Sequence, residues 1–269
     1  MLLFINFSIR QYSYCCINFL GHLNIQGNAI FPSLWLPDLS SLFPEADEKS
    51  GIITINTDVT IDSVTLDTQA DTSLRGSGLV VIGGNTTDIT DLIVSGFVHR
   101  PAITILAMDE DISVMLTRLT AENNQFGALF MYDRDTTTGF FETRIYSSNF
   151  TENSGLEWAD LYSKYLRNLY LENVDFQGSV ARHDSSTTYK AAPINLWDTA
   201  FTCFNCSFKE TDGSYAQAIV AGELSPVVIS GDTTTGSRFE HTMSNLNQSA
   251  PAFLMESNEK LKIEQFSYS

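Results

Sequence analysis

Apolar and polar residues alternate with a period of two along four segments, 144–150, 168–176, 201–208 and 262–269. This period is typical of β-strands that bury one face. No segment carries a sustained helical stripe, and the best helical candidate, 155–167, is interrupted by Ser163. The pattern therefore predicts an all-β fold.

A second pattern recurs along the chain: a polar corner, then Ala or Gly, then an aliphatic or aromatic residue that opens a strand. It is found at Ala29-Ile30, Gly51-Ile52, Gly78-Leu79, Ala102-Ile103, Ala128-Leu129, Gly155-Leu156, Ala192-Pro193-Ile194, Ala218-Ile219 and Ala252-Phe253. Six of the eight spacings lie between 22 and 27 residues, and the other two, 37 and 34, carry polar insertions.

A repeat of roughly 25 residues is too short for a strand-helix-strand unit, which needs about 30. It fits one turn of a parallel β-solenoid, in which each strand pairs with its equivalent one turn away, at about 4.8 Å. Small residues are needed where such a chain turns tightly. We therefore predict a parallel β-helix of about nine coils.

Two short motifs carry a resemblance to a known family. Phe150-Thr151-Glu152-Asn153 matches Phe-x-x-Asn, and Gly27-Asn28-Ala29-Ile30 nearly matches Gly-Gly-Ala-Ile. The corner pattern, over about residues 12–269, resembles that of right-handed parallel β-helices of the pectin-lyase-like kind. The motifs are similar to the degenerate repeats of polymorphic outer-membrane and related surface proteins. The resemblance implies a right-handed coil and an extracellular or cell-surface location.

The least regular stretch is 32–48, which holds three prolines and is expected to wrap outside the rod. The amino-terminal apolar run is too short for the roughly 20 residues that span a bilayer. Because an uncovered solenoid end is an open sheet edge, we expect further coils or a neighbouring protein at both ends. Residues 1–269 are thus interpreted as one β-helix domain within a longer protein.

Composition narrows the choice of partners. Only 17% of residues are charged, and the formal net charge is -17. A nucleic acid or an anionic membrane requires a basic face, so this balance argues against both. The acidity itself is explained by the solubility of a strand-rich rod.

Five N-glycosylation sequons occur, the first at Asn6. The glycosylation candidates are Asn85, Asn149, Asn205 and Asn247, of which Asn85 is expected to be best exposed. Asn149 and Asn205 lie beside predicted strands, where the alternative is a place in an internal side-chain ladder.

Acidic, threonine-rich loops recur, and the pentapeptide DTTTG occurs twice, at 135–139 and 232–236. Asp and Thr turn the chain while Gly takes a positive φ, which is a sufficient structural explanation. The functional alternative is a ligand face for glycans or protein, with Asp135, Thr137, Asp232 and Thr234 as its candidates.

Cysteine spacing leaves the chemistry open. Cys203 and Cys206 have the spacing of a metal knuckle or a redox pair, but a zinc site needs further ligands at suitable spacing. Three positions apart in a strand, they are expected on opposite faces. A disulfide remains open, and no metal or other cofactor is predicted.

For an enzyme, the resemblance implies polysaccharide cleavage, with a hydrolase carrying Asn-Thr-Asp followed by an Asp pair, Gly-His-Gly and Arg-Ile-Lys. Asn56-Thr57-Asp58 matches the first hydrolase motif, but no Asp pair, Gly-His-Gly or Arg-Ile-Lys follows. A lyase needs clustered carboxylates for calcium and a base, whereas the acidic residues 109–111 are consecutive and split between faces. No catalytic residue is assigned.

The sequence therefore favours a non-catalytic extracellular or surface scaffold or adhesion module. One alternative is a polysaccharide lyase or glycoside hydrolase. The other is a subunit of an extracellular filament assembled end to end.

Overall fold

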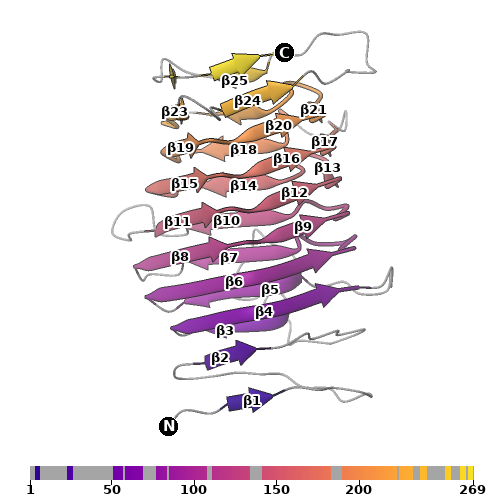
Figure 1. The fold of residues 1–269 in the computed structure, drawn as a ribbon, viewed down its shortest axis with the longest axis vertical. Coiled ribbons are helices and arrows are strands. Elements are labelled where there is room, and N and C mark those ends of the chain that lie inside the picture. The colour runs from indigo at the N-terminus through magenta and orange to yellow at the C-terminus, as the bar shows by residue number, and fades with distance from the viewer. Residues whose placement is uncertain are drawn as a thin grey trace.

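The structure is a computed structural model, and the residues it describes form an elongated stack of β-strands (Figure 1). It describes residues 4–6, 23–26, 51–56, 58–68, 77–83, 85–107, 111–133, 141–182, 190–222, 224–232, 237–240, 252–255, 261–264 and 266–268. The predicted excursion at 32–48 lies outside these ranges.

The strands form three sheets. The largest, of 16 strands, has the central order β26-β23-β19-β15-β11-β8-β6-β9-β12-β16-β20-β24-β27, with β4, β2 and β1 attached through β6. Its strands are β1 (Phe4–Asn6), β2 (Leu23–Gln26), β4 (Val59–Asp67), β6 (Thr86–Ser95), β8 (Ile112–Thr117), β9 (Thr120–Glu122), β11 (Phe141–Tyr146), β12 (Asn149–Thr151), β15 (Asn168–Glu172), β16 (Asp175–Gln177), β19 (Phe201–Phe204), β20 (Ser207–Lys209), β23 (Val227–Ser230), β24 (Ser237–Glu240), β26 (Leu261–Ile263) and β27 (Phe266–Tyr268).

An eight-stranded sheet lies opposite, in the order β25-β22-β18-β14-β10-β7-β5-β3. Its strands are β3 (Gly51–Asn56), β5 (Ser77–Gly83), β7 (Ile103–Ala107), β10 (Leu129–Asp133), β14 (Leu161–Lys164), β18 (Ile194–Trp197), β22 (Ile219–Ala221) and β25 (Phe253–Met255). The third sheet joins β13 (Ser154–Gly155), β17 (Val180–Ala181) and β21 (Asp212–Gly213).

Every strand pair in the described ranges is parallel, and each joins strands from successive turns of the chain. From β6 to β22 the chain makes about five turns, each with strands in both large sheets. Further strands extend the sheets on either side. The prediction of an all-β parallel β-solenoid is confirmed.

The alternating segments are strands as predicted, but three of them, 144–150, 168–176 and 201–208, are broken by a sharp corner. One residue per turn takes a positive φ there, close to the left-handed value: Ser63, Asp91, Arg118, Ser147, Asn173 and Asn205. A left-handed residue interrupts the alternation, so the inward-facing residues on its two sides are three positions apart instead of two. Leu171 and Val174, for example, lie on either side of Glu172 and Asn173 and are both fully buried.

The interior between the sheets is a continuous apolar core. It includes a phenylalanine column, Phe150, Phe176, Phe208 and Phe239, with one ring from each of four turns. Successive ring centroids are 5.1, 4.7 and 4.5 Å apart, and the rings are nearly parallel. Each buried ring removes enough apolar surface from water to contribute about 2–3 kcal/mol.

Two predicted registers are wrong. Gly51-Ile52 is one residue out of line with Gly78-Leu79, because Gly51 pairs with Ser77 and Ile53 pairs with Leu79. Ala102 and Ala128 are aligned as expected, but the residue that pairs with Leu129 in the next turn is Leu161, not Leu156. Gly155 instead belongs to β13, and Leu156 is 52% exposed. This turn of the coil adds the third sheet before β14, and a spacing count cannot separate an added corner from the strand that follows it.

Candidate functional site

The outer face of the eight-stranded sheet carries a contiguous group of aromatic side chains, which we call the aromatic ledge. It consists of Phe126, Phe130, Tyr132, Trp158, Tyr162 and Tyr165. Phe130 of β10 and Tyr162 of β14 stack with centroids 5.1 Å apart and planes 8° apart. Trp158 packs against both, at 5.7 and 4.9 Å. All of these residues except Tyr162 are half-buried, so the ledge presents rings to solvent.

The strand register builds the ledge. Phe130 lies between the inward-facing Leu129 and Met131, so it points outward, and it pairs directly with Tyr162 one turn on. Gly127, with φ +88°, leaves the space that Trp158 occupies, since a Cβ there would lie 2.4 Å from the indole Nε1. The ammonium of Lys164 lies 4.8 Å from the ring centre of Tyr165, where a cation is attracted by the ring face.

A second feature is a shallow polar groove on the outer face of β9, β12, β16 and β20, with a volume of about 400 Å³. Its lining side chains form two columns along the rod. One column is Thr120, Asn149, Asp175 and Ser207, and the other includes Thr151, Gln177 and Lys209. Burial raises the pKa of Asp175 above its ordinary value.

Charged side chains on the neighbouring strands β11 and β15 are engaged locally. Arg144 is ion-paired with Glu142, and the Tyr170 hydroxyl donates a hydrogen bond to Glu172 at 2.9 Å. Burial, together with Glu172, raises the pKa of Tyr170 to about 12. Glu172 pairs with Tyr146, four residues along β11 from Glu142. The two carboxylate-bearing positions are therefore roughly 13 Å apart along the strand direction.

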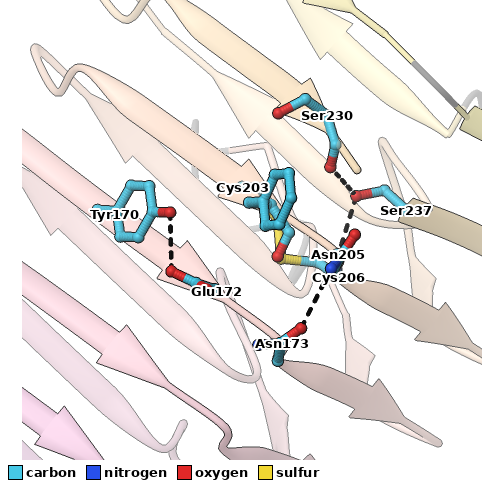
Figure 2. Close-up of a disulfide and its surroundings, with 9 residues drawn as sticks. Tyr170, Glu172, Asn173, Cys203, Asn205, Cys206, Ser230 and Ser237 are labelled. Carbon is cyan, nitrogen blue, oxygen red and sulfur yellow. Dashed lines mark hydrogen bonds between the residues drawn. A yellow bond between two sulfur atoms is a disulfide. The ribbon is translucent and has the colours of Figure 1, made fainter. Parts of the chain in front are cut away.

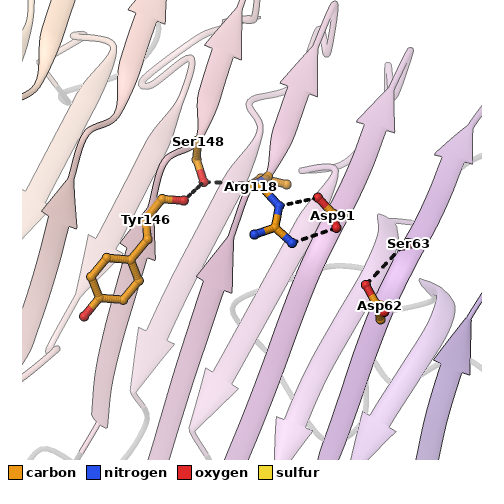
Figure 3. A network of polar contacts seen from close by, with 7 residues as sticks. Asp62, Ser63, Asp91, Arg118, Tyr146 and Ser148 are labelled. Atoms are coloured by element: carbon orange, nitrogen blue, oxygen red, sulfur yellow. Dashed lines mark hydrogen bonds and ion pairs between the residues drawn. The ribbon is translucent and has the colours of Figure 1, made fainter.

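Corner residues are linked from one turn to the next (Figure 3). Arg118 donates two hydrogen bonds to Asp91, Nε to Oδ1 at 2.6 Å and Nη2 to Oδ2 at 2.8 Å, and these lower the pKa of Asp91. The Ser148 hydroxyl accepts from the Leu119 amide at 3.0 Å and donates to the Tyr146 carbonyl at 2.7 Å. These contacts hold successive corners together.

A buried chain of polar side chains crosses several turns. Asn124 Nδ2 donates to Asn153 Oδ1 at 2.9 Å, and Asn153 Nδ2 donates to Asp160 Oδ1 at 3.0 Å. Ser179 Oγ donates to the same oxygen at 2.7 Å. Burial raises the pKa of Asp160 to about 7, although the bonds from Ser179 and Asn153 oppose the rise. The Phe-x-x-Asn motif thus places Phe150 in the phenylalanine column and Asn153 in this chain.

Cys203 and Cys206 form a disulfide (Figure 2). Both are fully buried, so their expected placement on opposite faces is wrong. The reason is the corner at Asn205, whose positive φ turns the second cysteine back toward the core. Among the described residues, no group of three or more His, Cys, Asp or Glu side chains is arranged to hold a metal ion.

The structure separates the predicted glycosylation candidates. Asn85 and Asn149 are exposed. Asn205 Nδ2 donates to Asn173 Oδ1 at 3.3 Å and to Asp232 Oδ2 at 3.2 Å, and its Oδ1 accepts from the Asp232 amide at 2.8 Å. Asn205 is therefore part of a corner ladder, which lies at the surface and not inside the coil as the alternative interpretation had it, and Asp232 is exposed beside it. The remaining candidates lie outside the described ranges: Asn247, Asp135, Thr137 and Thr234.

Sequence reasoning missed the aromatic ledge and the buried chain that ends at Asp160. The ledge joins residues 32 positions apart, such as Phe130 and Tyr162, and the correct register was needed to align them. A signal was present in the density of aromatic residues between 126 and 165. Asp160 follows Trp158-Ala159 in a stretch with no regular period.

Known proteins provide no family for this chain. No helix in the described part of the chain is long and apolar enough to cross a membrane. Comparisons with protein-family models, with curated proteins and with solved structures find no match.

Proposed function

We propose that this chain is a non-catalytic extracellular or surface scaffold, a right-handed β-helix of about nine coils that presents the aromatic ledge to a binding partner. The right hand follows from the strong preference of parallel strand crossovers for that hand. The aromatic ledge is the observation that carries the proposal.

A contiguous group of solvent-facing rings costs solubility and marks a binding surface in many proteins. Aromatic residues are enriched at interfaces because they combine a large contact area with few rotatable bonds. Tyr132, Tyr165 and Lys164 add polar groups at one end of the ledge. The ledge therefore suits an amphipathic partner, either a glycan or a protein surface.

The arrangement of carboxylates supports a binding role over hydrolysis. Glycosidases hold two carboxyl groups about 5–10 Å apart across one bond. The roughly 13 Å between the positions of Glu142 and Glu172 exceeds this range, and each side chain already has a partner. The polar groove is lined by one carboxylate, Asp175.

An extracellular location is supported by two features. The Cys203–Cys206 disulfide fits an oxidising compartment. Asn85 and Asn149, each the first residue of a sequon, are both exposed. Biotinylation of intact source cells, with a reagent that does not cross membranes, tests this location directly.

The binding role is tested with an array of defined oligosaccharides and with immobilised extracellular-matrix protein as probes. We expect Tyr132→Ala and Tyr165→Ala to weaken binding about tenfold or more, as loss of aromatic contact residues does. Tyr215→Ala is the matched control, because Tyr215 is 38% exposed and lies outside the ledge. If Tyr132→Ala and Tyr165→Ala bound the probes as tightly as the Tyr215→Ala control, the proposal would be contradicted.

The enzyme alternative has its own readout. The same oligosaccharides are incubated with the chain and assayed for new reducing ends and for unsaturated products. Turnover that falls in Glu142→Gln or Glu172→Gln would replace the scaffold proposal with a catalytic one.

A further inference from the structure

The polar groove contains one of the sequons. Asn149 and Thr151 are alternate residues of β12, so both side chains lie on its outer face, while Phe150 between them points into the phenylalanine column. Both outward residues line the groove. In Figure 1, β12 and β16 follow one another up the same side of the stack.

The side chain of Asn149 is exposed, and within the described ranges its amide group makes no hydrogen bond, although the backbone N–H donates to the Leu119 carbonyl at 2.8 Å. Asn205 has the opposite arrangement, because both atoms of its amide are engaged by Asn173 and Asp232. A sugar on Asn205 would have to break this corner ladder. A sugar on Asn149 displaces nothing.

Beyond Asn149 the groove continues over the next two turns. Asp175 and Gln177 of β16 line it next, followed by Ser207 and Lys209 of β20. These side chains supply both acceptors and donors, which sugar hydroxyl and acetamido groups can satisfy. The turns are about 4.8 Å apart, so the groove offers a new pair of polar groups at each step along the rod.

We propose that Asn149 carries an N-linked glycan whose first sugar residues lie in the polar groove, over β16 and β20. The inference rests on the proposed extracellular location. In the transfer, the amide nitrogen bonds to the anomeric carbon of a lipid-diphosphate-linked oligosaccharide. The bond from that carbon to the diphosphate breaks, the diphosphate leaves with the electron pair, and one amide proton passes to the transferase.

The test uses the full chain isolated from its source organism. Glycopeptide mass spectrometry measures occupancy at Asn85, Asn149 and Asn205, and we expect the first two to be occupied and Asn205 to be bare. Peptide N-glycosidase F is then applied to the folded and to the unfolded chain. A glycan that stays in the groove about nine-tenths of the time is released about tenfold more slowly than one in solvent. We expect this for Asn149 relative to Asn85 in the folded chain, and equal rates after unfolding.

Two variants made in the same organism test whether the glycan lies in the polar groove. Gln177→Ala and Lys209→Ala are expected to speed release from Asn149 in the folded chain severalfold without changing its occupancy. Lys262→Ala is the matched control, since Lys262 is exposed, pairs with Glu264 and lies on β26.

Each outcome separates the inference from the proposed function. If Asn85 is occupied and Asn149 is bare, the inference is wrong and the extracellular location stands. If neither is occupied, the inference fails and the location loses one of its supports, which leaves the biotinylation result to decide it. If Asn149 is occupied but its glycan is released as fast as the glycan on Asn85, the glycan is present and the proposal that it lies in the groove is wrong.

Discussion

Two ladders of aromatic rings in this protein have nearly the same geometry and opposite surroundings. In the phenylalanine column, Phe150 and Phe176 stack with centroids 5.1 Å apart and planes 16° apart. On the aromatic ledge, Phe130 and Tyr162 also lie 5.1 Å apart, with planes 8° apart. The column is fully buried, whereas Phe130 is half-buried and faces solvent.

The similarity shows that the parallel register places the rings, because residues that pair across a rung face each other directly. The two ladders differ in how far their rings are exposed to solvent. A ring that loses all its water contributes to folding, whereas a ring that keeps part of its hydration retains apolar surface for a partner. One backbone arrangement thus supports stability on its inner face and recognition on its outer face.

The largest effect is expected when the same substitution is made in each of the two ladders. Phe176→Ala removes a fully buried ring and leaves a cavity, so we expect it to lower the free energy of unfolding by about 3–5 kcal/mol. Phe130→Ala exposes less new apolar surface and should cost about 1–2 kcal/mol. Urea unfolding followed by circular dichroism measures both. Equal costs would show that the ledge is a second core.

The buried chain at Asp160 gives a test through pH. The pKa of Asp160 is about 7 in the folded state, above the ordinary 3.8. The folded state therefore binds the proton of this carboxyl group more tightly than the unfolded state does. The resulting stabilisation is fully present below about pH 4 and is lost as the pH rises to about 7, with a slope of at most about 1.4 kcal/mol per pH unit.

Asp160→Asn keeps an oxygen acceptor for Asn153 and Ser179 but does not titrate. We expect it to match the wild type near pH 4 and to be more stable at pH 8, by urea midpoints at both values. Asp111→Asn, at an exposed position, is the matched control. A variant that is less stable than the wild type at pH 8 would contradict the raised pKa.

The smallest effect is expected from a change at Gly127, which packs against Trp158 of the ledge. Gly127→Ala forces a Cβ against Trp158 at a positive φ, so we expect a loss of about 1–3 kcal/mol and a shift in tryptophan fluorescence. Gly178→Ala shares the positive φ, but its Cβ would be 3.4 Å from the nearest atom. It should cost about 1 kcal/mol and leave the fluorescence unchanged. An unchanged spectrum in Gly127→Ala would mean that Trp158 is not held by this contact.

The four alternating segments identified the strands because a period of two is a local property of a chain with one buried face. The corners within them were missed. Ser147, Asn173 and Asn205 take positive φ values, yet only Asn is a residue type that favours them, so the stacking of neighbouring turns must hold Ser147 there. The error for Cys203 and Cys206 has the same origin.

The candidate site was less accessible to sequence reasoning. Asn149 could be identified as a sequon, but its exposure and its place in the groove depend on Asp175, Gln177 and Lys209 from later turns. The ledge required the pairing of Phe130 with Tyr162 across the added corner at 154–160. Gly155 was assigned to the wrong sheet for the same reason.

By itself the sequence determined that this protein is all-β, built from repeated short strands, and wound as a parallel solenoid, because periodicity and repeat length are carried by neighbouring residues. Only the tertiary structure decided which residues share a rung and which face water. Register between turns is set by contacts between residues 25 to 35 positions apart, and a single added corner shifts every partner that follows.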